Sequence, residues 1–364
     1  MEKGQTQIAF GTTAEQMKAL YFNAATLKDV TYKLYQLNSR GERYYYTFGT
    51  DGEPIFFPSV TTVLHKVAPE NRGLTDWKLR MGKEAADNYT NERASYGTFI
   101  HGLIEQLVIS RRFNLEEIKE KLEKYVEREK LPYGFVESHI EEVKADMVAF
   151  AKWMRDYDVR PLAVEVALYS PTMGVAGMID LVADVREYPI SKEEEMVAKA
   201  SDEAMKRKVS DEEGKRKARE KYGKRIYAII DFKSGKKGFY DNYAQQLEIY
   251  RRMWNETFPE LPITRMFNIA PKEWMGTAKK VPTYNYEEQT DNPAINKVDP
   301  ILALFACEEE QDRKIVNISG TIDLNEAEEN NVQIYNLADL VKENRKKIDE
   351  AESAEDEIEE DELF

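Results

Sequence analysis

The chain has 364 residues, of which 42% are hydrophobic and 11% aromatic, so most of it is expected to fold around a sizeable core. Its single cysteine, Cys307, excludes internal disulfides and any four-cysteine zinc or iron–sulfur site. No apolar run is long enough to span a membrane, and residues 1–7 lack the charged-then-apolar layout of a signal peptide, so we expect a cytoplasmic protein.

The net charge of −15 argues at first against a nucleic-acid partner, because phosphate binding needs a positive surface. The charge is unevenly distributed, however. Residues 345–364 hold ten acidic and three basic side chains, whereas residues 205–225 hold ten basic and four acidic ones. An acidic average can therefore hide a basic working face.

Residues 1–90 are predicted to form an N-terminal β-hairpin and a helical lead-in. Residues 32–57 alternate aromatic and polar positions around Asn38-Ser39-Arg40-Gly41, a pattern typical of a hairpin. Residues 58–64 then indicate the end of a strand and the beginning of a helix, with Ser59 or Thr61 as its cap.

Three helices are predicted in the following segment. The first covers about residues 94–112 and the third about residues 134–157. Between them, Asn114 followed by Glu117 resembles a capping arrangement for a helix that ends near Lys130.

The second half of the chain is predicted to alternate strands and helices. Residues 186–225 are charged, nearly free of aromatics and helical in propensity, which indicates a helical insertion on the surface. The other expected elements are strands over 162–169 and 175–185, a strand that contains Asp231, a helix over 241–256, a strand over 263–269, a long ordered loop over 271–299, a helix over 331–347 and a disordered acidic tail over 346–364.

Polar residues that can carry chemistry recur on these elements. Asp231 and Lys233 lie two residues apart on an apolar strand and must share one face, where each buried charge needs a partner, a metal or a chemical use. His101 and Glu105 lie one turn apart on a helix, and Asp180 lies on a strand. Helix, strand, strand and helix thus contribute polar groups in turn.

Four motifs in this order resemble the PD-(D/E)xK nuclease superfamily, in its RecB-like and lambda-exonuclease-like branches. They are GxxxH at 97–101, a Gly-x-x-Asp strand at 177–180, (D/E)xK at 231–233 and QxxxY at 246–250. The match spans about residues 59–269 and includes a Pro-Ser-Val-Thr-Thr lead-in like that of phage-type members.

The resemblance implies the fold and the domain organisation. The fold class would be α/β (α+β), with a central mixed β-sheet flanked by helices, a restriction-endonuclease-like core. The expected domains are the lead-in at 1–90, the nuclease core at 91–345 and the tail at 346–364.

The resemblance also implies a magnesium centre, with Mn²⁺ as an alternative and one or two ions. Phosphodiester hydrolysis needs a hydroxide on an anionic phosphorus and a stabilised leaving alkoxide, which such ions supply. Asp180 and Asp231 offer hard oxygen ligands, His101 and the Phe232 carbonyl are the further ligands, and Lys233 would orient or help deprotonate the attacking water.

Three further residues have supporting roles in this hypothesis. Glu165, on the strand before Asp180, is placed where many members carry an additional acid, as a ligand through water to a second ion. Gln246 and Tyr250 are expected to hold their helix against the site and to contact the DNA backbone. Glu105 could do either.

Each assignment has a structural alternative. Asp231 and Lys233 alone could be a strand-edge ion pair, and His101 could be a packed helix histidine, as we expect of His65 and His139. Glu165 and Glu105 could simply pair with Lys or Arg. The charges of the 186–225 insertion are expected to form a solvated face.

The chain departs from the family pattern in one important spacing. Fifty residues separate Asp180 from Asp231, more than a short hairpin needs, so the insertion must fold away without separating the two strands. Cys307 alone cannot build the iron–sulfur cluster of some relatives, which disfavours that subgroup.

The expected function is a Mg²⁺-dependent deoxyribonuclease, an exonuclease of phage-type replication, recombination or degradation, in the host cytoplasm if phage-encoded. Its partner would be DNA, with no membrane. A catalytically idle subunit of a DNA-binding or recombination complex and a structure-specific endonuclease are the alternatives. The acidic tail is either a solvated segment, a docking tip for a single-strand-binding or recombination protein, or a mimic of DNA in the protein's own groove.

Overall fold

The computed structural model describes residues 7–9, 33–39, 42–50, 52, 54–68, 72–132, 134–207, 210–234, 239–272 and 282–319. The chain divides into two compact units, Met1–Tyr45 with Phe57–Leu302, and Tyr46–Phe56 with Ala303–Phe364. All candidate site residues belong to the first unit. The described part is a mixed α and β structure with two sheets, which confirms the expected α+β class.

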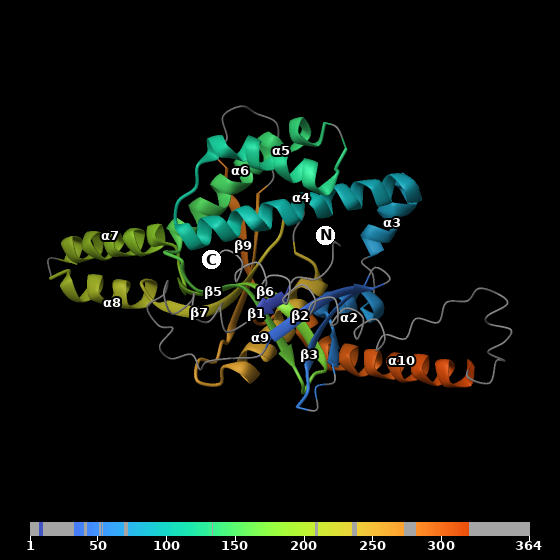
Figure 1. Ribbon diagram of the computed structural model, residues 1–364. Helices are drawn as coiled ribbons and strands as arrows, with labels where there is room; N and C mark the ends of the chain where they lie inside the picture. The colour runs from blue at the N-terminus through green and yellow to red at the C-terminus, as the bar shows by residue number, and fades with distance from the viewer. Residues whose placement is uncertain are drawn as a thin grey trace, which may run out of the picture. The chain divides into compact units, whose positions relative to one another are not determined.

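A five-stranded mixed sheet forms the centre of the first unit (Figure 1). The strands β5 and β6 pair in antiparallel fashion, as do β6 with β7 and β8 with β9, whereas β7 and β8 run parallel. Helix α9 (Asp241–Thr257) makes the crossover that a parallel pair requires. The strands are β5 (Arg160–Ser170), β6 (Val175–Arg186), β7 (Arg225–Phe232), β8 (Arg265–Pro271) and β9 (Tyr284–Glu288).

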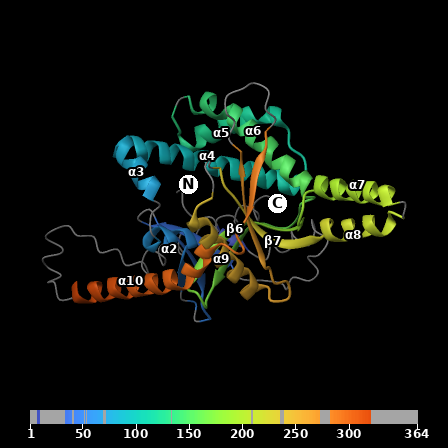
Figure 2. The ribbon, with the colours of Figure 1, turned by 180° about the vertical axis from the view of Figure 1, so that it is seen from behind.

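Helices cover this sheet on both faces. In the front and back views, α4 (Lys83–Ser110), α5 (Ile118–Glu129) and α6 (Phe135–Asp156) lie on one side and α9 on the other (Figures 1 and 2). One hydrophobic core cluster joins the first three helices to the sheet, and Trp153 and Ile230 are fully buried in it. This burial of apolar area is what fixes α4, and hence His101, over the strands.

The N-terminal segment contributes a second sheet of order β1-β2-β3-β4. Its strands are β1 (Gln7–Ala9), β2 (Lys33–Ser39), β3 (Glu42–Phe48) and β4 (Pro54–Pro58), so the predicted hairpin over 32–57 is present as β2 and β3. Ser59 caps α2 (Val60–Val67) by accepting a hydrogen bond from the Thr62 N–H at 3.0 Å, as expected. Ser59 also bridges to Ala176 of β6.

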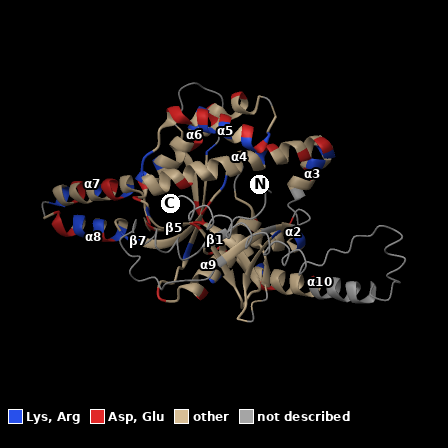
Figure 3. Ribbon diagram, viewed as in Figure 1, with Lys and Arg blue, Asp and Glu red and all other residues tan. Residues whose placement is uncertain are grey.

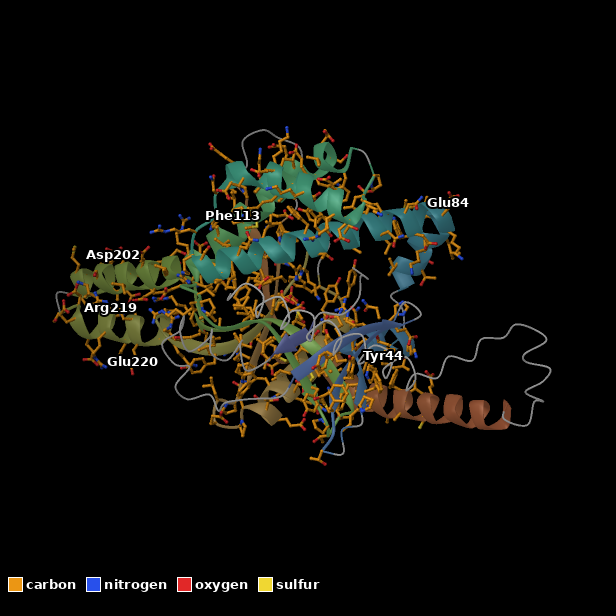
Figure 4. All side chains as sticks on the ribbon, in the orientation of Figure 1. Tyr44, Glu84, Phe113, Asp202, Arg219 and Glu220 are labelled. Atoms are coloured by element: carbon orange, nitrogen blue, oxygen red, sulfur yellow. The ribbon has the colours of Figure 1, made fainter. Side chains whose placement is uncertain are left out.

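The insertion between β6 and β7 is a pair of helices, α7 (Ile190–Arg207) and α8 (Glu212–Tyr222), that lie side by side (Figure 1). The strands stay paired from Leu181 with Ile230 to Arg186 with Arg225, so the insertion does not separate them. Acidic and basic residues are interspersed along both helices (Figure 3), and several form ion pairs one turn apart, as expected of a solvated face. Arg219 and Glu220 project from α8 (Figure 4).

Other expectations on boundaries were wrong. The segment predicted as a loop over 271–299 contains β9 and the 3₁₀ turn η3 (Pro293–Lys297), because alternating Tyr284 and Tyr286 pack toward the core despite the polar composition around them. Helix α4 begins at Lys83 instead of residue 94. The prediction missed its first turns because they are mostly exposed and show no apolar stripe. Helices α3 (Arg72–Met81) and α10 (Val298–Ser319) were not anticipated.

Two predicted segments, the helix over 331–347 and the tail over 346–364, lie outside the described residues. Among the helices that are described, none combines the length and the apolar character needed to cross a membrane.

Candidate metal centre

Strand pairing brings the two predicted aspartates together. Leu181 of β6 pairs with Ile230 of β7, so Asp180 and Asp231 follow as neighbours at the next position. Asp231 in turn pairs with Asn268 of β8. Two carboxylates and an amide therefore meet on three adjacent strands, where the side chain of Asp231 is only 3% exposed and that of Asp180 12%.

His101 reaches this point from α4. Its Nδ1 lies 3.8 Å from Asp180 Oδ2 and 3.9 Å from Glu165 Oε1. One ligand atom from each of these three residues lies within 4.8 Å of the others. Asp180 Oδ2 also accepts a hydrogen bond from the Phe232 N–H at 2.7 Å, which fixes the carboxylate. The structure thus unites one helix and two strands in a single donor group.

The donor set of this group is one that can hold a divalent cation. Two ligands at about 2.1 Å from one ion are about 3.0 Å apart at right angles and about 4.2 Å apart when opposite. The observed separations of 3.8 and 3.9 Å lie between these two values, so the side chains would shift by a few tenths of an ångström to reach the near-ideal octahedron that Mg²⁺ requires. Two carboxylates with one imidazole suit Mg²⁺ or Mn²⁺, and the imidazole favours Mn²⁺.

Glu165 is held in this group by an unusual backbone conformation. Val164 pairs with Leu181 and Val166 with Ile179, so Glu165 lies across from Asp180. Its φ is +48°, in the left-handed region that residues other than glycine rarely adopt. Such a conformation costs about 1–2 kcal/mol. The rest of the sheet therefore holds Glu165 in a strained position that brings its carboxylate to His101.

Asp231 and Lys233 form a separate ion pair beside the group. Lys233 Nζ lies 2.7 Å from Asp231 Oδ2, and the same oxygen accepts a hydrogen bond from Asn268 Nδ2 at 2.7 Å. Among the described residues, the group of three includes Glu165 where Asp231 was predicted. The ligand role of the Phe232 carbonyl stays a prediction, and the Phe232 N–H donates a hydrogen bond to Asp180.

Helix α9 fixes Lys233 from the other side. Lys233 Nζ donates to Gln246 Oε1 at 3.1 Å, and Gln246 Nε2 donates to the Tyr250 hydroxyl at 3.0 Å. The ammonium also lies 4.4 Å from the centre of the Tyr243 ring. The expected helix-positioning role of Gln246 and Tyr250 is thus matched by a chain of contacts that ends on Lys233.

Both glycines of the motifs allow close approaches. A Cβ on Gly177 would lie 2.7 Å from Cε1 of Tyr250, closer than real Cβ contacts, so glycine is needed for Tyr250 to pack on β6. A Cβ on Gly97 would lie 3.3 Å from Ser234 Oγ, just after Lys233. Arg93 adds a hydrogen bond to the Ser234 carbonyl at 3.1 Å. These contacts hold α4 and α9 against the strand ends.

The carboxylates of this group stabilise positive charge on their neighbours. Burial alone would lower the pKa of His101, but Asp180, Glu165 and Asp231 raise it to about 9. Burial raises the pKa of Asp231 to about 6, although Lys233 opposes the shift. For Lys233, the nearby aspartates outweigh burial and raise the pKa. Without a metal, a proton on His101 supplies the charge that the carboxylates require.

The remaining predicted residues lie apart from the metal group. Glu105 is half-buried, has neither a hydrogen bond nor an ion pair with a described residue, and has a pKa raised by burial. His139 is structural, as expected, because Nδ1 bonds to the Phe135 carbonyl at 2.9 Å and its ring stacks on Phe135.

Sequence reasoning missed Asn268 and Tyr243. Asn268 is fully buried in the structure. Its position as a polar residue inside an apolar strand was the signal visible in the sequence. Tyr243 lies one turn before Gln246 on the face that Tyr250 shares, which is also visible from spacing.

No protein-family model matches the chain, and none of the curated proteins shows significant similarity to it. The class of site must therefore be inferred from the residues and their geometry.

Proposed function

We propose that this protein is a metal-dependent DNA nuclease of the PD-(D/E)xK superfamily, in its RecB-like or lambda-exonuclease-like branch, that hydrolyses phosphodiester bonds as an exonuclease. The observation that carries the proposal is the convergence of His101, Glu165 and Asp180 beside the Asp231–Lys233 pair. Four sequence motifs, far apart along the chain, supply all of these residues except Glu165, together with the α9 contacts to Lys233.

His101, Glu165 and Asp180 would hold the Mg²⁺ or Mn²⁺ ion. When bound, such an ion supplies a nucleophilic hydroxide near neutral pH and a charge that stabilises phosphoryl oxygens. A bound cation would also replace the proton on His101, because a metal-ligating imidazole must be neutral. Metal binding should therefore release a proton from the site.

Lys233 would act on the phosphate through its positive charge. Its pKa is raised, so the side chain is an ammonium at neutral pH and is better suited to stabilise a phosphoryl oxygen than to remove a proton from water. Asp231 and Gln246 fix the ammonium by direct contacts of 2.7 and 3.1 Å. Asp231, oriented by Asn268, would be a positioning residue for Lys233 as well as a neighbour of the ion.

End-labelled linear duplex and closed circular duplex, each incubated with Mg²⁺ and with EDTA, test the proposal. We expect the wild-type protein to shorten the linear duplex only with Mg²⁺, to leave the closed circle intact, and to lose this activity in a Lys233→Ala variant. Cutting of both substrates would indicate an endonuclease. DNA binding without Mg²⁺-dependent cleavage would indicate the idle DNA-binding subunit, and equal activity of Lys233→Ala would remove the assignment.

A further inference from the structure

A cavity of about 670 Å³ lies against the last turns of α4. It is lined from α4, from the short 3₁₀ helix η2 (Leu115–Glu117) and from α5. One of its lining residues is Glu105, which lies one helical turn from His101 on the same face of α4. The volume falls within the range of about 300–1,000 Å³ typical of small-ligand sites. The cavity thus begins one helical turn along α4 from His101 and has the capacity for a ligand of nucleotide size.

An aromatic ring and a cation lie together in this cavity. Phe113, labelled in Figure 4, packs partly against the main core, which holds its ring in place. Lys121 Nζ lies 5.2 Å from the centre of that ring, donates to Gln106 Oε1 at 2.8 Å and lies 3.5 Å from Glu117 Oε2, a partly exposed pair that a phosphate would displace. An aromatic face suits a flat base, and an ammonium suits a phosphate. Amide groups of Gln106 and Asn114 add donors and acceptors.

Glu105 adds a carboxylate in need of a donor. It is half-buried and, within the part of the chain that the structure describes, makes neither a hydrogen bond nor an ion pair. A partly buried carboxylate is stabilised by a donor that replaces the lost water. The amino groups of nucleobases and the hydroxyl of deoxyribose are such donors.

We propose that this cavity binds one nucleoside 5′-monophosphate, with its base beside Phe113, its phosphate at Lys121 and a donor facing Glu105. The proposal rests on the nuclease function above and deepens it, because an exonuclease handles single nucleotides at strand ends. The nucleotide can be the terminal unit of a strand or the free mononucleotide released by cleavage.

Titration calorimetry with dAMP, deoxyadenosine and a 5′-phosphorylated tetranucleotide in EDTA tests this pocket. We expect dAMP to bind wild-type protein, and Phe113→Leu, which keeps an apolar side chain but removes the aromatic face, to weaken it about tenfold or more. Lys121→Gln should weaken dAMP about tenfold but leave deoxyadenosine unchanged. Lys124→Gln, a control on the same helix outside the cavity, should match wild type.

These measurements distinguish a strand end from a released mononucleotide as the ligand, and they test the pocket separately from the nuclease. Binding of the tetranucleotide with the same dependence on Phe113 and Lys121 assigns the pocket to strand ends, and binding of dAMP alone assigns it to the released product. Absence of dAMP binding in a protein that cleaves DNA would overturn the pocket and leave the nuclease intact. Binding of dAMP by a wild-type protein that does not cleave DNA would support the pocket and count against the nuclease, whereas the Lys233→Ala variant should bind dAMP as wild type does. Equal binding by folded Phe113→Leu would contradict the proposal.

Discussion

Asp231 and Asn268 contact each other through both backbone and side chain. They pair between β7 and β8, and Asn268 Nδ2 donates a hydrogen bond to Asp231 Oδ2 at 2.7 Å. The carboxylate that holds Lys233 is therefore fixed by a neighbouring strand as well as by Lys233 itself. Because both Asp231 and Asn268 are buried, no water can readily replace the amide.

An Asn268→Ala variant should lose both stability and activity. A buried carboxylate deprived of its donor costs about 1–3 kcal/mol in the free energy of unfolding, measured by urea denaturation. We expect DNA cleavage to fall at least about tenfold, because Asp231 no longer fixes Lys233. Wild-type cleavage in the folded variant would show that the amide does not position the pair.

A Glu165→Gly variant should be more stable than wild type but less active. Glycine adopts the positive φ of this position without cost, so the free energy of unfolding should rise by about 0.5–1 kcal/mol in EDTA at pH 10, where His101 has lost the proton that Glu165 stabilises, while Mg²⁺-dependent cleavage at neutral pH falls at least about tenfold. Lys130→Gly is the matched control, since Lys130 also has a positive φ, 53°, but lies at the end of α5. The control should gain stability and keep full activity. Loss of stability in Glu165→Gly would contradict the view that this backbone is strained.

The stability of the metal-free protein should fall between neutral and alkaline pH. The folded pKa of His101, about 9, is above its ordinary value of 6.5, so protonation stabilises the fold. This contribution is complete below pH 6.5 and is lost as the pH rises through 9, with a size of roughly 3 kcal/mol. Urea unfolding in EDTA from pH 6 to pH 10, compared with His101→Gln, measures it. Parallel curves for the two proteins would show that His101 does not carry the effect.

Removal of the α7–α8 insertion should spare the site. The Glu187 N–H donates to the Lys224 carbonyl at 2.9 Å, so the strand ladder continues to the base of the insertion. An Asn-Gly turn in place of residues 188–223 would close this hairpin, and Tyr188 and Tyr222, which pack on each other, would leave together. We expect cleavage rates within about twofold of wild type. A large loss of activity in the folded variant would show that the insertion binds substrate.

Much of the site could be predicted because its residues lie on elements with strong local patterns. His101 and Asp180 lie on a helix and a strand that spacing and apolar content identify, and the ordered motifs indicated that these elements meet. The strain at Glu165 and the bond from Asn268 could not be predicted, since both depend on how separate strands align. Strand β9 was missed because its two tyrosines lie among polar residues, and its pairing with β8 is a long-range contact.

The central claim is that a metal ion held by Asp180 cleaves DNA, and the most direct measurement is the Mg²⁺-dependent cleavage rate of linear duplex by Asp180→Asn and Asp184→Asn. Both aspartates lie on β6, but Asp184 is paired with Arg225 at 2.9 Å and lies outside the donor group. We expect Asp180→Asn to be slower than wild type by roughly a hundredfold or more, and Asp184→Asn to retain its rate. Equal rates for the two variants, or no Mg²⁺-dependent cleavage by wild type, would contradict the account.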